Sequence, residues 1–132
     1  MVSNTNKIYI AIIEDDDSHS RAVARLLRAS GYHPVSYRSA ESFLDDTKRP
    51  AFDCLVVDIQ LEGMSGIELN EQLTSTGFTT PVIFVTAHEK ANELEQSLRT
   101  RCAALIRKSD PGDVLLTVID QAIYANNSQL KT

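Results

Sequence analysis

Five short runs of hydrophobic residues recur along the chain, separated by longer segments that are mostly polar. Several runs are hydrophobic at every position and rich in Ile, Val and Leu, which is typical of strands covered on both faces of a parallel sheet. The second run reads Pro-Val-Ser-Tyr; it is the weakest and suits an edge of the sheet. The predicted strands are residues 8–13, 34–37, 54–57, 82–85 and 103–106.

Five helices are expected between and after these strands, because hydrophobic residues there recur every three or four positions. The first carries Val23, Leu26 and Leu27 on one face and ends at Gly31. The other four carry hydrophobic residues around Phe43, Leu69, Leu94 and Ile119. Strands and helices that alternate with short connections predict an α/β fold with one parallel sheet.

Polar residues mark where the later helices begin. Ser39 is suited to cap the second helix, and Ser65 with Glu68 fits a capping box at the start of the third. Asp110 followed by Pro111 supplies a cap and a first-turn proline for the last helix.

The 132-residue chain has the size of one compact domain. We expect this domain over residues 8–125, with a polar tail at 1–7 and a polar tail or the start of a linker at 126–132. Hydrophobic residues make up 42% of the chain and charged residues 23%. That balance argues against general disorder.

Charge, termini and cysteines exclude several functions. The formal net charge of −5 disfavours direct nucleic-acid binding, which needs a basic face, without excluding a DNA-binding partner domain. Residues 1–7 lack a signal-peptide core and residues 8–13 are too few to span a bilayer, so we expect a cytoplasmic protein without a membrane partner. Cys54 and Cys102 are too few for a disulfide framework or a zinc-ligand set.

Residues able to take part in chemistry follow four of the five predicted strands. In open α/β sheets the working site lies at the carboxyl ends of the strands, so these residues are expected to converge. They are Glu14, Asp15 and Asp16 after the first strand, Asp58 after the third, Thr86 and Ala87 after the fourth, and Arg107 and Lys108 after the fifth.

The acids at this edge would repel one another. Two like charges ~4 Å apart repel by roughly 4 kcal/mol at an effective dielectric near 20. A cluster of Glu14, Asp15 and Asp58 therefore needs a cation or a proton. Oxygen ligands with no neighbouring His or Cys favour Mg²⁺ over Zn²⁺. Asp16 and Asp17 are expected instead to cap the following helix and complement its dipole.

The same residues suit phosphoryl transfer, which needs a nucleophile, a metal and further donors. Asp58 can form an aspartyl phosphate, and Lys108, the Thr86 hydroxyl and the Ala87 backbone N–H can contact its oxygens. Each residue alone has an ordinary interpretation: a turn aspartate, a solvated lysine, a β-branched strand end. The ordered set favours the functional interpretation.

In this order, Ile-Ile-Glu-Asp-Asp at 12–16, Val-Val-Asp-Ile-Gln-Leu-Glu-Gly-Met-Ser-Gly at 56–66, Val-Thr-Ala at 85–87 and Lys108 resemble the response regulator receiver family. The resemblance covers roughly residues 7–125. It implies a flavodoxin-like, doubly wound sheet of five parallel strands in the order 2-1-3-4-5 with five helices.

The resemblance further implies a phosphoprotein of a two-component system, in which Asp58 accepts a phosphoryl group from a histidine kinase in a phosphorelay. Asp15 and Asp58 would bind Mg²⁺ directly, with the backbone carbonyl of Gln60 as a third ligand and Glu14 acting through water. Thr86, Ala87 and Lys108 would contact the phosphate. Such a domain catalyses its own phosphorylation and dephosphorylation and is not otherwise an enzyme.

Further partners implied by the resemblance are an output domain or downstream protein. A second copy of the chain is another, through the face of the fourth helix, fifth strand and fifth helix. Gln60 and His88 would border the site and tune dephosphorylation, although His88 equally suits an exposed position at a helix start. Two residues depart from the family pattern: Ser109 replaces a proline that is often cis, and Leu105 replaces an aromatic that moves inward with Thr86. Both bear on signal transmission.

Two alternatives follow from these residues. A receiver-like module that binds partners without phosphorylation is motivated by Leu105 and Ser109, and retained partner binding by Asp58→Ala would support it. An aspartate-nucleophile phosphatase typically has a second aspartate two residues after the nucleophile, where this chain has Gln60. Sustained Asp58-dependent hydrolysis of phosphomonoesters would support that hypothesis.

Overall fold

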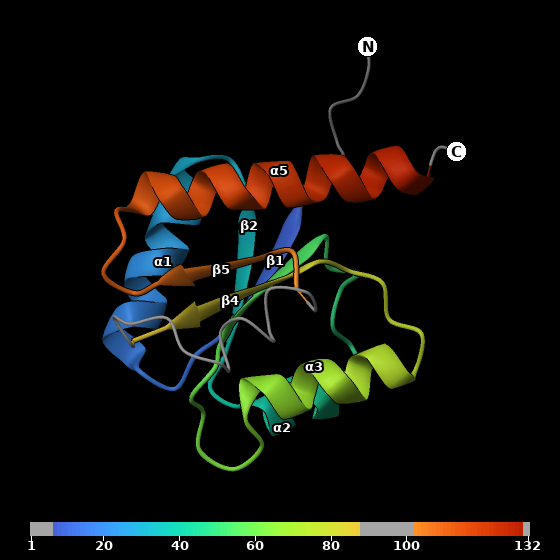
Figure 1. Cartoon of the computed structure of the whole chain (residues 1–132). Helices are drawn as coiled ribbons and strands as arrows, with labels where there is room; N and C mark the ends of the chain where they lie inside the picture. The colour runs from blue at the N-terminus through green and yellow to red at the C-terminus, as the bar shows by residue number, and fades with distance from the viewer. Residues whose placement is uncertain (1–6, 88–101, 131–132) are drawn as a thin grey trace.

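The computed structural model describes residues 7–87 and 102–130 of the chain. Its centre is one sheet of five parallel strands in the order β2-β1-β3-β4-β5, as the sequence resemblance implied (Figure 1). The weak second run forms an edge strand, also as expected. The strands are β1 (Tyr9–Ile13), β2 (His33–Tyr37), β3 (Cys54–Asp58), β4 (Val82–Thr86) and β5 (Ala104–Arg107).

Helices cover both faces of the sheet, giving three layers (Figure 1). In the described residues, α1 and α5 pack on one face, and α2 and α3 pack on the other. The helix expected around Leu94 lies outside the described residues. The helices described are α1 (Asp17–Ala29), α2 (Ala40–Asp45), α3 (Gly66–Ser75) and α5 (Gly112–Leu130).

The core is divided between the two faces because successive strand residues point to opposite sides. In β1, Ala11 and Ile13 pack with the α2–α3 layer, whereas Ile10 and Ile12 pack with the α1–α5 layer. Each of these four side chains is at most 1% exposed. Burial on both faces explains why the strands are hydrophobic at every position rather than at alternate ones.

The predicted helix starts are confirmed for α1, α2 and α3. Asp16 accepts hydrogen bonds from the first turn of α1. Ser39 caps α2, and Ser65 with Glu68 forms a reciprocal capping box for α3. Gly31, with a φ of +92°, follows the end of α1, where a left-handed conformation is needed.

The last helix differs from the expectation at both ends. The Asp110 carboxylate accepts a hydrogen bond from the Arg107 backbone N–H at 3.0 Å, and α5 begins at Gly112. Residues 126–130, expected from the sequence to form a polar tail, continue this helix to Leu130. None of the helices in the described part of the chain is long and apolar enough to cross a membrane. Cys54 is buried, and Cys102 is partly exposed.

Candidate functional site

The residues predicted to take part in phosphoryl transfer meet at the carboxyl edge of the sheet. Parallel pairing aligns Asp58 with Val85 and Thr86 with Arg107, so the ends of β3, β4 and β5 lie side by side. The Lys108 backbone N–H donates to the Thr86 carbonyl at 2.8 Å, which extends the pairing of β4 and β5 by one residue. Side chains far apart in the sequence are therefore brought together by strand register alone.

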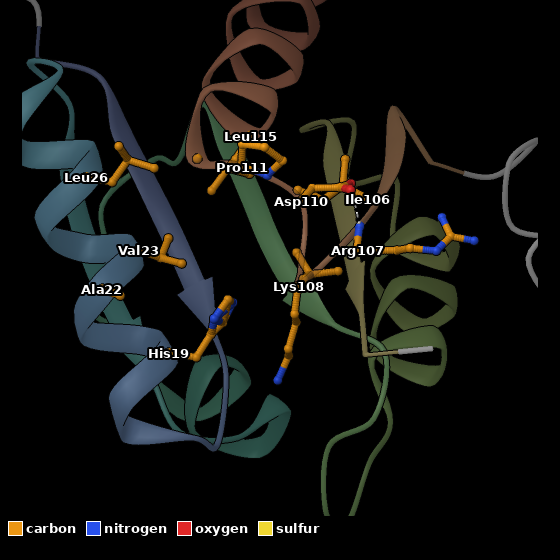
Figure 2. Close-up of a pocket in the computed structure, with 12 residues that line it drawn as sticks. His19, Ala22, Val23, Leu26, Ile106, Arg107, Lys108, Asp110, Pro111 and Leu115 are labelled. Carbon is orange, nitrogen blue, oxygen red and sulfur yellow. Dashed lines mark hydrogen bonds between the residues drawn. The ribbon is translucent and has the colours of Figure 1, made fainter. Parts of the chain in front are cut away.

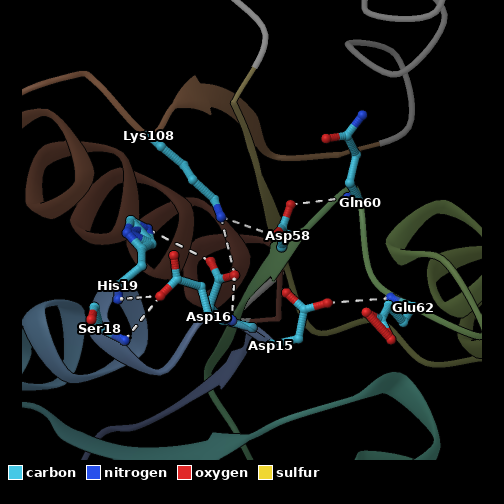
Figure 3. Close-up of polar contacts among 9 residues, drawn as sticks. Asp15, Asp16, Ser18, His19, Asp58, Gln60, Glu62 and Lys108 are labelled. Atoms are coloured by element: carbon cyan, nitrogen blue, oxygen red, sulfur yellow. Dashed lines mark hydrogen bonds and ion pairs between the residues drawn. The ribbon is translucent and has the colours of Figure 1, made fainter.

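Three carboxylates form a compact acidic cluster (Figure 3). One oxygen from each of Glu14, Asp15 and Asp58 lies within 4.8 Å of the others. Glu14 and Asp58 are only 4% and 5% exposed, whereas Asp15 is more accessible. Burial strengthens the repulsion between such charges because little water screens them. The cluster is thus suited to a cation.

Lys108 supplies one positive charge to this cluster. Its amine lies 3.1 Å from Asp58 Oδ2 and 3.1 Å from Glu14 Oε2 (Figure 3). Burial tends to lower the pKa of Lys108, but its hydrogen bonds to Asp58 and Glu14 outweigh burial and raise the pKa above its usual range. The amine is therefore charged at neutral pH and holds two of the three acids.

Glu14 is the acid of this cluster that binds a proton near neutral pH. Burial, a hydrogen bond with Asp58 and the Asp58 charge together raise the pKa of Glu14 to about 7, against the opposing effects of Lys108 and the Asp16 N–H. A proton on Glu14 relieves part of the repulsion among the acids. Glu14 is consequently the cluster member whose charge changes near neutral pH.

We expect Glu14 to make the metal-free protein less stable as pH rises from about 5 to 7. Unfolded, Glu14 loses its proton near its ordinary pKa of 4.5, whereas folded it keeps the proton until about 7. The folded state binds more protons in this window, so the free energy of unfolding falls with pH, by at most ~1.4 kcal/mol per unit. Urea unfolding at several pH values measures the slope.

Glu14→Gln is the control for this prediction, because the variant cannot titrate at position 14. His19, whose pKa is lowered first by burial and then by Lys108, contributes a slope of opposite sign in both proteins. The difference between wild type and variant therefore reports the Glu14 carboxyl together with its coupling to His19 and Asp58. Equal slopes in the two proteins would contradict the prediction.

One residue near the acids was missed from the sequence. The expectation of no neighbouring histidine is wrong: His19 Nε2 lies 3.8 Å from Glu14 Oε1. His19 occupies the first turn of α1, which Asp16 fixes by accepting the Ser18 and His19 N–H groups. A histidine three residues after a helix cap was the available signal, but its direction depends on how α1 packs.

The loop after β3 is packed closely against Asp58. A Cβ at position 66 would collide with the Asp58 carbonyl oxygen and would lie 2.9 Å from Val57 Cγ1, so only glycine fits there. The Gly66 N–H donates to the Ile59 carbonyl at 3.1 Å. Gln60 donates its backbone N–H to Asp58 Oδ1 at 2.9 Å, while its side chain points away from the acids (Figure 3).

The other predicted residues lie as follows. Thr86 ends β4 and is 2% exposed, and Ala87 follows it at the surface. Leu105 is buried in the core layer facing α2 and α3. Ser109 is exposed in the turn after Lys108, and the described residues contain no cis peptide bond. His88 lies outside the described residues.

A pocket of about 360 Å³ flanks Lys108 between α1 and the start of α5 (Figure 2). Val23 and Leu26 line it from α1, and Pro111 and Leu115 line it from the opposite side. Figure 2 shows the Lys108 amine pointing away from Pro111 and Leu115. Lys108 is thus directed toward the acids rather than into the hydrophobic part of the pocket.

A family model described as "Response regulator receiver domain" matches residues 10–120. The chain belongs to this family. Response regulator protein TodT of Pseudomonas putida is 35% identical to this receiver over 79 residues, which are 60% of this chain and 35% of that protein. Transcriptional regulatory protein FixJ of Bradyrhizobium diazoefficiens is 26% identical over 119 residues, 90% of this chain and 58% of that protein. The receiver thus matches less than two thirds of the length of either relative.

Solved structures agree with this assignment. The structure of response regulator StyR is 29% identical, has a TM-score of 0.84, and covers 96% of this chain and 64% of that one. The structure titled FixJ-N has a TM-score of 0.80 at 23% identity, covers 91% of this chain and 96% of that one, and supports the fold alone. As a member of this family, the receiver is a signalling domain of two-component systems.

Proposed function

We propose that this receiver is a phosphoacceptor switch in which Asp58 takes a phosphoryl group from a histidine kinase. The observation that carries the proposal is the placement of the Asp58 carboxylate. It is buried, it lies 3.1 Å from the Lys108 amine, and its oxygen is within 4.8 Å of oxygens of Glu14 and Asp15. A nucleophile between a fixed cation and a metal-ligand cluster suits phosphoryl transfer.

The proposed cofactor is Mg²⁺. Asp15 and Asp58 would bind it directly, Gln60 through its backbone carbonyl, and Glu14 through water. The donor set fits, because the three clustered groups are hard carboxylate oxygens whose mutual repulsion a divalent cation relieves. When bound, the ion neutralises charge on the phosphoryl oxygens and orients the donor.

The transfer is a displacement at phosphorus. An Asp58 oxygen attacks the phosphorus of the kinase phosphohistidine and forms a new P–O bond. The P–N bond breaks, and its electron pair stays on the imidazole nitrogen, which leaves with the kinase. The receiver holds its nucleophile ready: Lys108 contacts Asp58 Oδ2, and the Gln60 N–H contacts Oδ1.

Three groups at the ends of β4 and β5 are proposed to contact the phosphoryl oxygens: the Thr86 hydroxyl, the Ala87 N–H and the Lys108 amine. Thr86 and Lys108 are already linked through the backbone hydrogen bond between them. Gln60 and His88 are proposed to tune dephosphorylation from the edge of the site.

Phosphorylation is proposed to shift the population of conformations at the face around the expected fourth helix and the fifth helix, and so alter partner binding. Leu105 lies in β5 and Ser109 in the turn that leads to α5. Both are proposed to modify how the signal is transmitted. An output domain or downstream protein is the proposed partner. A second copy of the chain is another, bound through the face of the expected fourth helix, β5 and α5. The greater length and the name of FixJ support an output in transcription, with DNA bound outside this domain.

Intact mass after incubation with a small phosphodonor tests the proposal. With Mg²⁺ present, one phosphate adduct per chain is expected. With a chelator in place of Mg²⁺, the adduct should be lost or greatly reduced, because the acidic cluster then repels the donor. Absence of an adduct in the presence of Mg²⁺ would contradict the proposed function.

A further inference from the structure

Three carboxylates hold the loop between β3 and α3. Each accepts one backbone N–H, and the three donors are alternate residues of the loop. The pairs are Gln60 N–H to Asp58 Oδ1 at 2.9 Å, Glu62 N–H to Asp15 Oδ2 at 3.3 Å, and Met64 N–H to Glu41 Oε2 at 2.8 Å. The carboxylates come from three places: the end of β3, the segment just after β1, and the first turn of α2. The loop position is therefore set by side chains from three separate elements.

Two of these carboxylates are also candidate metal ligands. Asp58 and Asp15 also belong to the acidic cluster, in which each can offer one carboxylate oxygen to a divalent cation. A carboxylate that also binds a cation is a poorer hydrogen-bond acceptor, so metal binding would weaken the hydrogen bonds of Asp58 and Asp15 to the loop N–H groups. Glu41 is the one acid of the three outside that cluster. Its carboxylate is therefore not itself shared with the metal.

The contact of Glu41 with the loop is close and specific. Gly63 adopts a φ of +75°, and a Cβ added there would lie 2.6 Å from Glu41 Oε2. A glycine next to Met64 thus lets the carboxylate reach the backbone. An acid in the first turn of a helix ordinarily complements only the helix dipole. The Glu41 carboxylate reaches instead to a residue 23 positions further along the chain.

We infer that Glu41 is a positioning residue that holds the β3–α3 loop in place and thereby sets the affinity of the acidic cluster for a divalent cation. This inference rests on the proposed function, because the loop carries Gln60, whose carbonyl is a proposed ligand. A loop already held in position loses less conformational freedom when the cation binds. Glu41 thus acts on the metal without touching it.

The test compares wild type, Glu41→Ala, Glu41→Gln and Asp45→Ala. Glu41→Gln keeps an acceptor oxygen at position 41. Asp45 is an exposed acid one turn further along α2, so Asp45→Ala removes the same charge without the loop contact. Amide resonances of the ¹⁵N-labelled proteins are followed first without metal and then during a Mg²⁺ titration.

We expect the metal-free Met64 amide resonance to move in Glu41→Ala and to stay near its wild-type position in Asp45→Ala. The Mg²⁺ dissociation constant should rise about threefold to tenfold in Glu41→Ala. Glu41→Gln and Asp45→Ala should stay within about twofold of wild type. The rate of adduct formation in Glu41→Ala should fall at low Mg²⁺ and recover at saturating Mg²⁺, a split that a general loss of structure would not produce.

Two results would overturn the inference: Mg²⁺ binding by Glu41→Ala that matches wild type, or equal weakening in Asp45→Ala, which would indicate a general charge effect. Both leave the proposed function standing. Failure of the wild-type protein to bind Mg²⁺ would contradict the proposed function as well, so the two failures are distinguishable.

Discussion

Asp58→Asn is expected to give no phosphate adduct with Mg²⁺ and a small phosphodonor. The asparagine side chain has nearly the same shape, so packing around the 5%-exposed position should be kept. Its neutral amide is a far weaker nucleophile than a carboxylate, and the bond to phosphorus should not form. Intact mass spectrometry over a time course is the measurement, with wild type in parallel.

Asp53→Asn is the matched control for this experiment. Asp53 lies just before β3, at the opposite end of the strand from the site, where its carboxylate accepts the Tyr9 N–H at 3.0 Å. The same substitution there should leave adduct formation unchanged. An adduct that persists in Asp58→Asn would place the phosphoacceptor on another residue and would remove the basis of the proposed function.

Lys108→Ala is expected to slow adduct formation about 100-fold, the usual effect of losing one fixed donor to a developing charge. The substitution removes the cation that lies 3.1 Å from both Glu14 and Asp58. Without that cation the two buried acids repel each other more strongly, and the incoming phosphoryl oxygens lose a positive partner. Initial rates of mass gain at saturating Mg²⁺ separate this effect from weakened metal binding.

Arg107→Ala provides the comparison for Lys108→Ala, since it removes a cation from the neighbouring position. Figure 2 shows the Arg107 side chain pointing away from Lys108. Its removal should change the initial rate by less than about twofold, because its charge is directed away from Lys108 and solvent screens it. Equal rates in Lys108→Ala and wild type would show that the lysine does not assist the transfer.

The fold was predictable because its strands are buried on both faces. Continuous hydrophobic runs such as 54–57 and 82–85, with helical segments between them, are typical of the inner strands of a parallel sheet. The caps were predictable because Ser39 and Ser65 act within three residues of their own position. The end of α5 was missed because Asn126 and its polar neighbours resemble a tail. In the structure the helix that precedes them continues through them to Leu130.

The site was predictable as far as strand ends determine it. The carboxyl ends of parallel strands must meet, so Glu14, Asp15, Asp58 and Lys108 could be brought together from the sequence. His19 and Glu41 could not, because each projects from a helix. Where a helical side chain points depends on the rotation and packing of the helix, which no local sequence signal determines.

The contact between Lys108 and Glu14 joins residues 94 positions apart in the chain. Closing so long a loop costs entropy that only the complete set of tertiary contacts offsets. Partly folded chains should therefore lack the pairing that prepares Asp58. Phosphate uptake then serves as a functional readout of the native population, and destabilising substitutions anywhere in the core should lower the reactive fraction in proportion to the protein they unfold.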